Sequence, residues 1–235
     1  MKIRTLVQHA VLTSTLCLAL AVPTLAHSAA VYLIGDGFAN GSDSMTLTAT
    51  PAPDENPVPT GGFTGRIGPN PGPNPPTTTF LFWCAELTQS FGFGTVYTDY
   101  SISPLTNVLL SQLFTEVGGS GNATTSQTNS AAFQLSVWEI LFEHGTYGGL
   151  NVSSGNFSAT GDAGAISQAN TWLAALTATS PATTHLFMIT SPDQQDFITD
   201  TPMPPSLLLI PEPSPLPLLG VGLIALYLVQ RRRAK

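Results

Sequence analysis

The clearest strand predicted in this 235-residue chain is the segment Thr77-Thr-Thr-Phe80-Leu-Phe82-Trp83-Cys84-Ala-Glu-Leu87. Its Thr and aromatic residues favour strands. Because side chains alternate between the two faces of a strand, Phe80, Phe82 and Cys84 share one face. The segment therefore predicts a strand that carries Cys84 near its end.

Other strands are predicted on both sides of this segment. Runs of β-branched and aromatic residues, bounded by Gly, Pro and Asn, mark them. The predicted strands are Val31–Gly35, Met45–Thr50, Thr95–Ile102, Thr184–Thr190 and Asp196–Thr199. The intervening stretch Pro51–Pro76 is so dense in Pro and Gly that we expect an exposed loop there, without regular structure.

Helices are predicted between the strands, where apolar residues recur every three or four positions. The predicted helices are Pro104–Val117, Ala131–Glu143 with Asn129 or Ser130 as its N-cap, and a third that begins after Asp162 and is stopped by Ser180-Pro181. Strands, then helices, then strands predict an α+β domain, with an antiparallel β-sheet or sandwich and a packed helical subdomain.

The two ends of the chain differ in composition from this domain. Residues 1–30 have the basic start, short apolar core and small-residue cleavage sites of a signal peptide, with cleavage expected between His27 and Val31. The apolar core is too short for a membrane anchor. The predicted organisation is therefore a signal peptide at 1–30, a domain at 31–200, a Pro-rich linker at 201–217 and a tail at 218–235.

The tail is expected to form a hydrophobic helix that ends in a basic cluster, Arg231, Arg232 and Arg233. Twelve helical residues span about 18 Å, which is short of the roughly 30 Å hydrocarbon core of a bilayer. The basic end is expected to stay cytoplasmic. We therefore expect the tail to hold the chain in the membrane before it is processed.

Charge is distributed unevenly along the chain. Between Val31 and Ile210 there are thirteen acidic residues and one basic residue, Arg66, which gives this part a net charge of −12. A surface of this charge excludes nucleic acid as a partner. The expected surface of Thr, Ser, Asn, Gln and Gly is typical of an extracellular protein.

Cysteine usage is the second unusual feature. Cys17 is expected to leave with the signal peptide, so Cys84 has no intramolecular disulfide partner. In an oxidising compartment such a thiol is buried and inert, paired between chains, or chemically committed. Burial is the simplest of these, since free cysteine packs like a small hydrophobic residue.

The C-terminal segment resembles the PEP-CTERM sorting signal of Gram-negative bacteria that make extracellular polysaccharide. The matching features are Pro211-Glu212-Pro213, the apolar run and Arg231 to Arg233. The resemblance implies that membrane-embedded exosortase recognises the tail and cuts near Pro-Glu-Pro. It implies an exported, surface or matrix location and says nothing about the work of the domain.

The domain is similar to the bacterial Cys-Gln thioester domains, through short motifs in the same order. Phe82-Trp83-Cys84-Ala-Glu-Leu87 is similar to their aromatic-Cys-hydrophobic segment, and Phe133-Gln134-Leu-Ser-Val-Trp138-Glu139 looks like their helical Gln motif. Gln195 or Gln194 takes the place of their later Gln. Departures are Phe133 before Gln134 and the polar residues before both later glutamines.

This second resemblance implies an internal thioester between Cys84 and Gln195 or Gln194, with Gln134, Trp138 and Trp83 supporting its pocket. Such a bond is an activated acyl group that a partner's amine can attack once. The resemblance therefore implies adhesion through a covalent bond and not enzymatic turnover. No cofactor is implied. The partner is expected to be a surface protein or another amine-bearing ligand.

Two alternatives stay open from the residues alone. The first is a structural matrix component in which Cys84 is buried and unreactive. The second is a secreted cysteine hydrolase, which needs His144 or His185 beside Cys84. A metal site is not expected, because one cysteine and two separated histidines lack ligand spacing.

Overall fold

The computed structural model describes residues 30–70, 74–143, 145–204 and 207. The expected signal-peptide segment before residue 30 and the sorting tail from residue 208 onward lie outside these residues. Within the described ranges, no helix is both long and apolar enough to cross a membrane.

The described strands form a closed antiparallel barrel in the order β1-β4-β5-β9-β8-β6, and a separate sheet in the order β3-β2-β7. The strands are β1 (Val31–Phe38), β2 (Asp43–Thr48), β3 (Val58–Thr60), β4 (Phe63–Pro69), β5 (Thr78–Cys84), β6 (Val96–Leu105), β7 (Ser158–Thr160), β8 (Leu186–Thr190) and β9 (Phe197–Thr199). Closure leaves the barrel without free edges.

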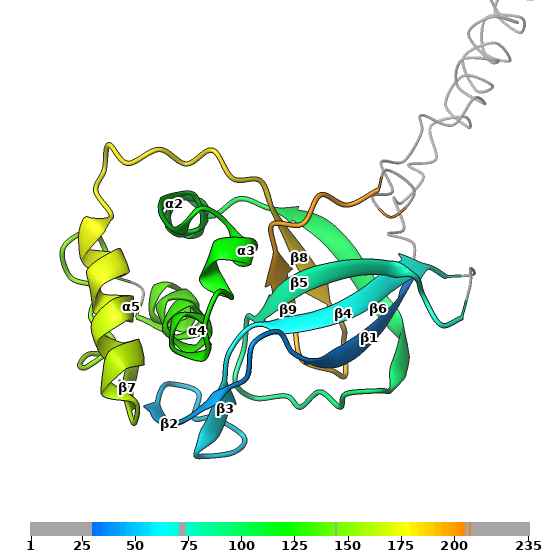
Figure 1. The fold of residues 1–235 in the computed structure, drawn as a ribbon, viewed down its shortest axis with the longest axis horizontal. Coiled ribbons are helices and arrows are strands. Elements are labelled where there is room, and N and C mark those ends of the chain that lie inside the picture. The colour runs from blue at the N-terminus through cyan, green and yellow to red at the C-terminus, as the bar shows by residue number, and fades with distance from the viewer. Residues whose placement is uncertain (1–29, 71–73, 144, 205–206, 208–235) are drawn as a thin grey trace, which may run out of the picture. The chain divides into compact units, whose positions relative to one another are not determined.

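Helices gather on one side of the barrel (Figure 1). They are α2 (Val108–Val117), α3 (Ser120–Ala123), α4 (Gln127–Phe142) and α5 (Ala163–Ala175). Every residue of α4 from Ser130 to Ile140 is buried, so this helix forms the centre of the helical subdomain. The predicted α+β class, with an antiparallel sheet and a packed helical subdomain, is confirmed.

The helix starts are corrected in two places. Ser126 is the N-cap of α4, since its Oγ accepts a hydrogen bond from Asn129 N at 3.1 Å, so Asn129 and Ser130 are not caps. Helix α2 begins at Val108 because Pro104 and Leu105 still pair with β8. The predicted cap of α5 is confirmed, since Asp162 Oδ1 accepts from Ala165 N at 2.6 Å.

The predicted loop Pro51–Pro76 contains β3 and β4, so this prediction was wrong. In β4 the buried residues Phe63, Gly65 and Ile67 alternate with less buried ones, and its proline is the last residue. Pro59 is tolerated because β3 is an edge strand of the small sheet. Prolines thus occur at the edge or end of these strands without preventing them.

Candidate functional site

Cys84 is the last residue of β5, and its side chain is 4% exposed. It lies opposite Phe197 of β9 in the antiparallel register. The pairing continues past the strand ends, because Ala85 N donates to Asp196 O at 2.9 Å. Cys84 is a free thiol at the place where β5 pairs with β9.

Gln134 of α4 holds the backbone of Cys84 at both of its polar groups. Cys84 N donates to Gln134 Oε1 at 2.9 Å, and Gln134 Nε2 donates to Cys84 O at 2.9 Å. Gln134 is fully buried, so water does not compete for these bonds. Its amide is therefore used to position Cys84 and is not free to react with it.

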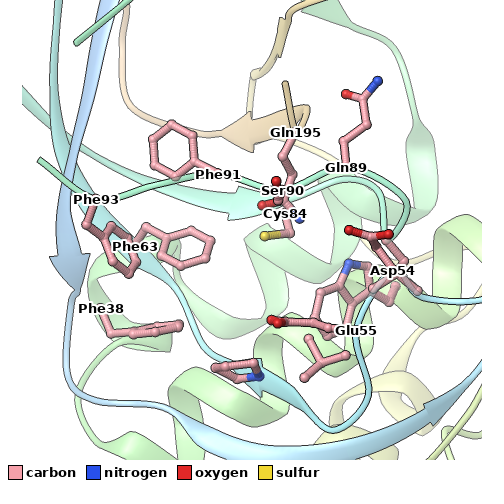
Figure 2. A pocket seen from close by; sticks show the side chains of 14 residues that line it. Phe38, Asp54, Glu55, Phe63, Cys84, Gln89, Ser90, Phe91, Phe93 and Gln195 are labelled. Atoms are coloured by element: carbon pink, nitrogen blue, oxygen red, sulfur yellow. The ribbon is translucent and has the colours of Figure 1, made fainter. Parts of the chain in front are cut away.

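Gln195 is the glutamine that the fold brings to Cys84. It precedes Phe197, the strand partner of Cys84, by two residues, and it lines the same cavity as Cys84. Figure 2 shows the Cys84 sulfur pointing into the cavity that both residues line, with Gln195 beside it.

The two candidate glutamines therefore differ in position. Gln195 Nε2 donates to Glu86 O at 3.3 Å, and its own carbonyl accepts from Tyr100 Oη at 2.8 Å. Gln194 does not line the cavity, and its backbone N donates to Ser191 Oγ at 3.2 Å. The geometry favours Gln195 over Gln194 as the partner of Cys84.

The cavity has a volume of about 250 Å³, and five of its fourteen lining residues are aromatic. Phe38, Phe63 and Phe93 lie together along one side of it, and Asp54 and Glu55 lie on the other (Figure 2). The remaining aromatic lining residues are Phe91 and Trp138. Cys84 is buried at this cavity, whereas Asp54 and Glu55 are exposed to solvent.

Trp83, predicted to support the pocket, is not among the residues that line this cavity. It follows Phe82 and precedes Cys84, so its side chain leaves β5 on the opposite face from the sulfur. Its Nε1 donates to Ser120 Oγ at 2.8 Å, and its ring lies 4.5 Å from the ring of Phe133. Trp83 instead joins the barrel to α3 and α4.

Burial controls the ionisation of the site. Removal from water raises the pKa of the Cys84 thiol well above its ordinary value, and the nearby charge of Glu86 raises it further. Burial also raises the pKa values of Glu86 and Asp196. The thiol is therefore neutral at neutral pH, which makes it a poor target for oxidants and small electrophiles.

No described histidine lies beside Cys84 to act as its base. His185 lines a second cavity with Ser111 and Phe187. Ile189 of β8 pairs with Phe197, the strand partner of Cys84. His185 lies four residues before Ile189, and therefore about 13 Å from it along the chain. His144 lies outside the described residues, and no cluster of three metal-ligating side chains occurs within them.

Sequence reasoning missed the segment that covers the sulfur. Phe91 and Phe93 lie in a loop between β5 and β6 and pack edge-on at 6.1 Å between ring centroids. Phe91 also packs against Phe197 at 4.9 Å. The signal available was the Phe91-Gly-Phe93-Gly94 sequence, where glycines let the chain turn between two aromatic residues.

Comparison with known proteins identifies the tail. The PEP-CTERM protein-sorting motif matches residues 209–233, which confirms the predicted sorting signal and marks the chain as an exported protein of the kind that exosortase processes. No curated protein sequence matches the chain.

Among solved structures, the chain is similar to the N-terminal thioester domain of a surface protein from Clostridium perfringens. The identity is 12%, and the match covers 73% of this chain and 98% of that one, with a TM-score of 0.39. A score of this size supports no statement about shared chemistry, so the function is argued below from this chain's own residues.

Proposed function

We propose that this exported protein attaches covalently to an amine-bearing partner through a thioester between Cys84 and Gln195. The observation that carries the proposal is that both side chains line one partly aromatic cavity, while Gln134 fixes the Cys84 backbone there. An unpaired thiol, a neighbouring carboxamide and shielding from water are what this chemistry requires.

The bond forms by acyl transfer within the chain. Cys84 Sγ attacks the side-chain carbonyl carbon of Gln195, the sulfur–carbon bond forms, and the carbon–nitrogen bond of the carboxamide breaks. The thiol proton leaves with the nitrogen as ammonia. A partner's primary amine then attacks the same carbonyl, forms an amide with Gln195 and returns Cys84 to the thiol, so the acyl group is used once.

The charge of the domain suits an amine as the second reactant. Asp54 and Glu55 line the cavity on the side away from Phe38, and both are exposed. They favour a cationic side chain at the entrance by Coulomb attraction. The domain's own chain offers no competing lysine between Val31 and Ile210.

The C-terminal sorting tail determines the location at which the protein attaches to its partner. Signal peptidase and exosortase are the processing partners, and the membrane holds the chain until the tail is removed. The product is an adhesion or extracellular-matrix protein of an exopolysaccharide-producing Gram-negative cell. Replacing Pro211 and Pro213 by Ala is expected to leave the tail uncut in an exosortase-containing strain, as measured by the size of the cell-associated chain.

Intact mass tests the proposed bond. In a Cys17→Ser background, the purified full chain is expected to weigh about 17 Da less than its sequence requires, through loss of ammonia. Cys84→Ala is expected to restore the full mass. Full mass together with one titratable thiol in the Cys84 protein contradicts the proposal.

A second candidate function is that of a structural matrix component, and one observation favours it. Cys84 is buried and its thiol pKa is raised, as for an inert core cysteine. In that case Cys84→Ala changes stability alone, and no ammonia is lost from the unsubstituted chain. The same mass measurement therefore separates the two functions.

A further inference from the structure

The indole of Trp138 carries a hydrogen-bond donor that the fold leaves unused. Trp138 is 1% exposed, and its Nε1 has no acceptor among the described residues. Buried donors are nearly always paired, so an exception points to a partner that is absent from the described fold. The indole N–H of Trp83, in the same core, is satisfied by Ser120.

The residue that carries this donor, Trp138, lines the cavity of Cys84 and Gln195. Among the described residues, Asp43, Gln112 and Glu139 also carry a buried side-chain atom without a hydrogen-bond partner, but none of these three residues lines the cavity. Trp138 also follows Gln134 by one turn of α4, on the same face. The helix that fixes the Cys84 backbone thus presents the indole to the cavity.

Three backbone donors near the sulfur are already engaged. Cys84 N donates to Gln134 Oε1, and Ala85 N donates to Asp196 O. Asp196 N donates to Glu86 Oε1 at 3.1 Å. These three groups are therefore not available to a negative charge that develops next to Cys84, whereas the Trp138 indole N–H has no acceptor in the described fold.

We propose that the Trp138 indole N–H donates a hydrogen bond to the acyl oxygen of the Cys84–Gln195 thioester, both in the resting bond and while the bond forms or is opened by an amine. This inference rests on the proposed function. In both steps the carbonyl carbon becomes tetrahedral and its oxygen takes up negative charge, which a pre-placed donor in a dry site stabilises. Trp138 keeps its proton throughout; the thiol proton still leaves with ammonia.

The test is the rate at which methylamine opens the thioester of the full chain, followed by release of the Cys84 thiol in a Cys17→Ser background. Trp138→Phe keeps an aromatic ring and removes the N–H. It is expected to slow the reaction about 10²-fold, the loss typical of one such donor. Trp172→Phe, a partly buried indole of α5 outside the cavity, is the matched control and is expected to react at the unsubstituted rate.

A second measurement covers the case in which Trp138→Phe fails to fold. In the unsubstituted chain, the Trp138 indole proton resonance is expected to lie downfield of its position in Cys84→Ala, because the hydrogen bond forms only with the acyl oxygen. Equal positions, or a folded Trp138→Phe that reacts within twofold of the unsubstituted chain, overturn the inference alone. An unsubstituted chain that has lost no ammonia overturns the proposed function as well.

Discussion

Gln134 and Cys84 are joined by a pair of hydrogen bonds that use both ends of one side-chain amide and both polar groups of one backbone residue. The bonds connect the central helix α4 to the end of β5. They lock Cys84 at the cavity while leaving its sulfur free. This contact is the structural reason for assigning chemistry to Cys84.

Gln134→Ala is expected to destabilise the fold and to reduce thioester formation. The change leaves a buried N–H and a buried C=O of Cys84 without partners, which costs about 1–3 kcal/mol for each group. Urea unfolding and intact mass measure the two effects. Gln168→Ala is the control, because Gln168 is a partly buried glutamine of α5. If Gln134→Ala loses no more free energy of unfolding than Gln168→Ala does, the assigned role of Gln134 is contradicted.

Gln195→Ala and Gln194→Ala form a second matched pair. Gln195 lines the cavity with Cys84, and Gln194 does not. We expect Gln195→Ala to abolish the ammonia loss and Gln194→Ala to retain it, with both chains folded by circular dichroism. Retention of the mass deficit in Gln195→Ala shows that another carboxamide is used.

Phe91→Ala is expected to shorten the lifetime of the thioester in water. Phe91 packs against Phe197 at 4.9 Å and lines the cavity, so its removal admits water to the acyl carbon. The measurement is the recovery of the Cys84 thiol with time at neutral pH. Val108→Ala, an exposed apolar residue of α2, is expected to leave the lifetime unchanged.

The stability of the fold is expected to decrease as pH rises from about 4.5 to 7, because of Glu139. Burial raises the pKa of Glu139 to about 7, opposed by the Asn151 N–H and increased by the charge of Glu143. A raised folded pKa contributes stability below the unfolded pKa, and that contribution is lost as pH rises through the folded value.

Glu139→Gln tests this assignment. It is expected to remove most of that pH dependence and to stabilise the protein at pH 8 by roughly 1–3 kcal/mol relative to the unsubstituted chain. Urea unfolding at pH 5 and pH 8 gives both values. An unchanged slope in Glu139→Gln assigns the pH dependence to other groups, such as Glu86 and Asp196.

Secondary-structure elements that depend on local sequence pattern could be predicted from the sequence, and elements that depend on long-range contacts could not. The strand that contains Cys84 and the Asp162 cap are local, and both were predicted, although that strand ends at Cys84 and not at Leu87. Strand β4 was not, because it lies in the segment Pro51–Pro76, whose many Pro and Gly residues predicted a loop. A Cβ on Gly65 would meet Phe82 and the Ile34 carbonyl, so the glycine serves close strand packing that only the folded barrel reveals.

The site was predicted in part for the same reason. The motif order nominated Cys84, Gln134 and Trp138, and the structure brings all three together. The choice between Gln194 and Gln195 depends on the register of β9 against β5, which a single sequence does not encode locally. The position of Trp83 followed from strand alternation alone, so it could have been excluded from the pocket before the structure.

The most direct test of the central claim is to find the Cys84–Gln195 bond itself in the purified chain. Trypsin has no site between Arg66 and Arg231, so the chain is digested with pepsin at acidic pH, which also protects the thioester from amines. The account predicts one linked species that joins the Cys84 peptide to the Gln195 peptide, about 17 Da lighter than their sum. Two separate peptides, both at full mass and with the Cys84 thiol free, contradict it.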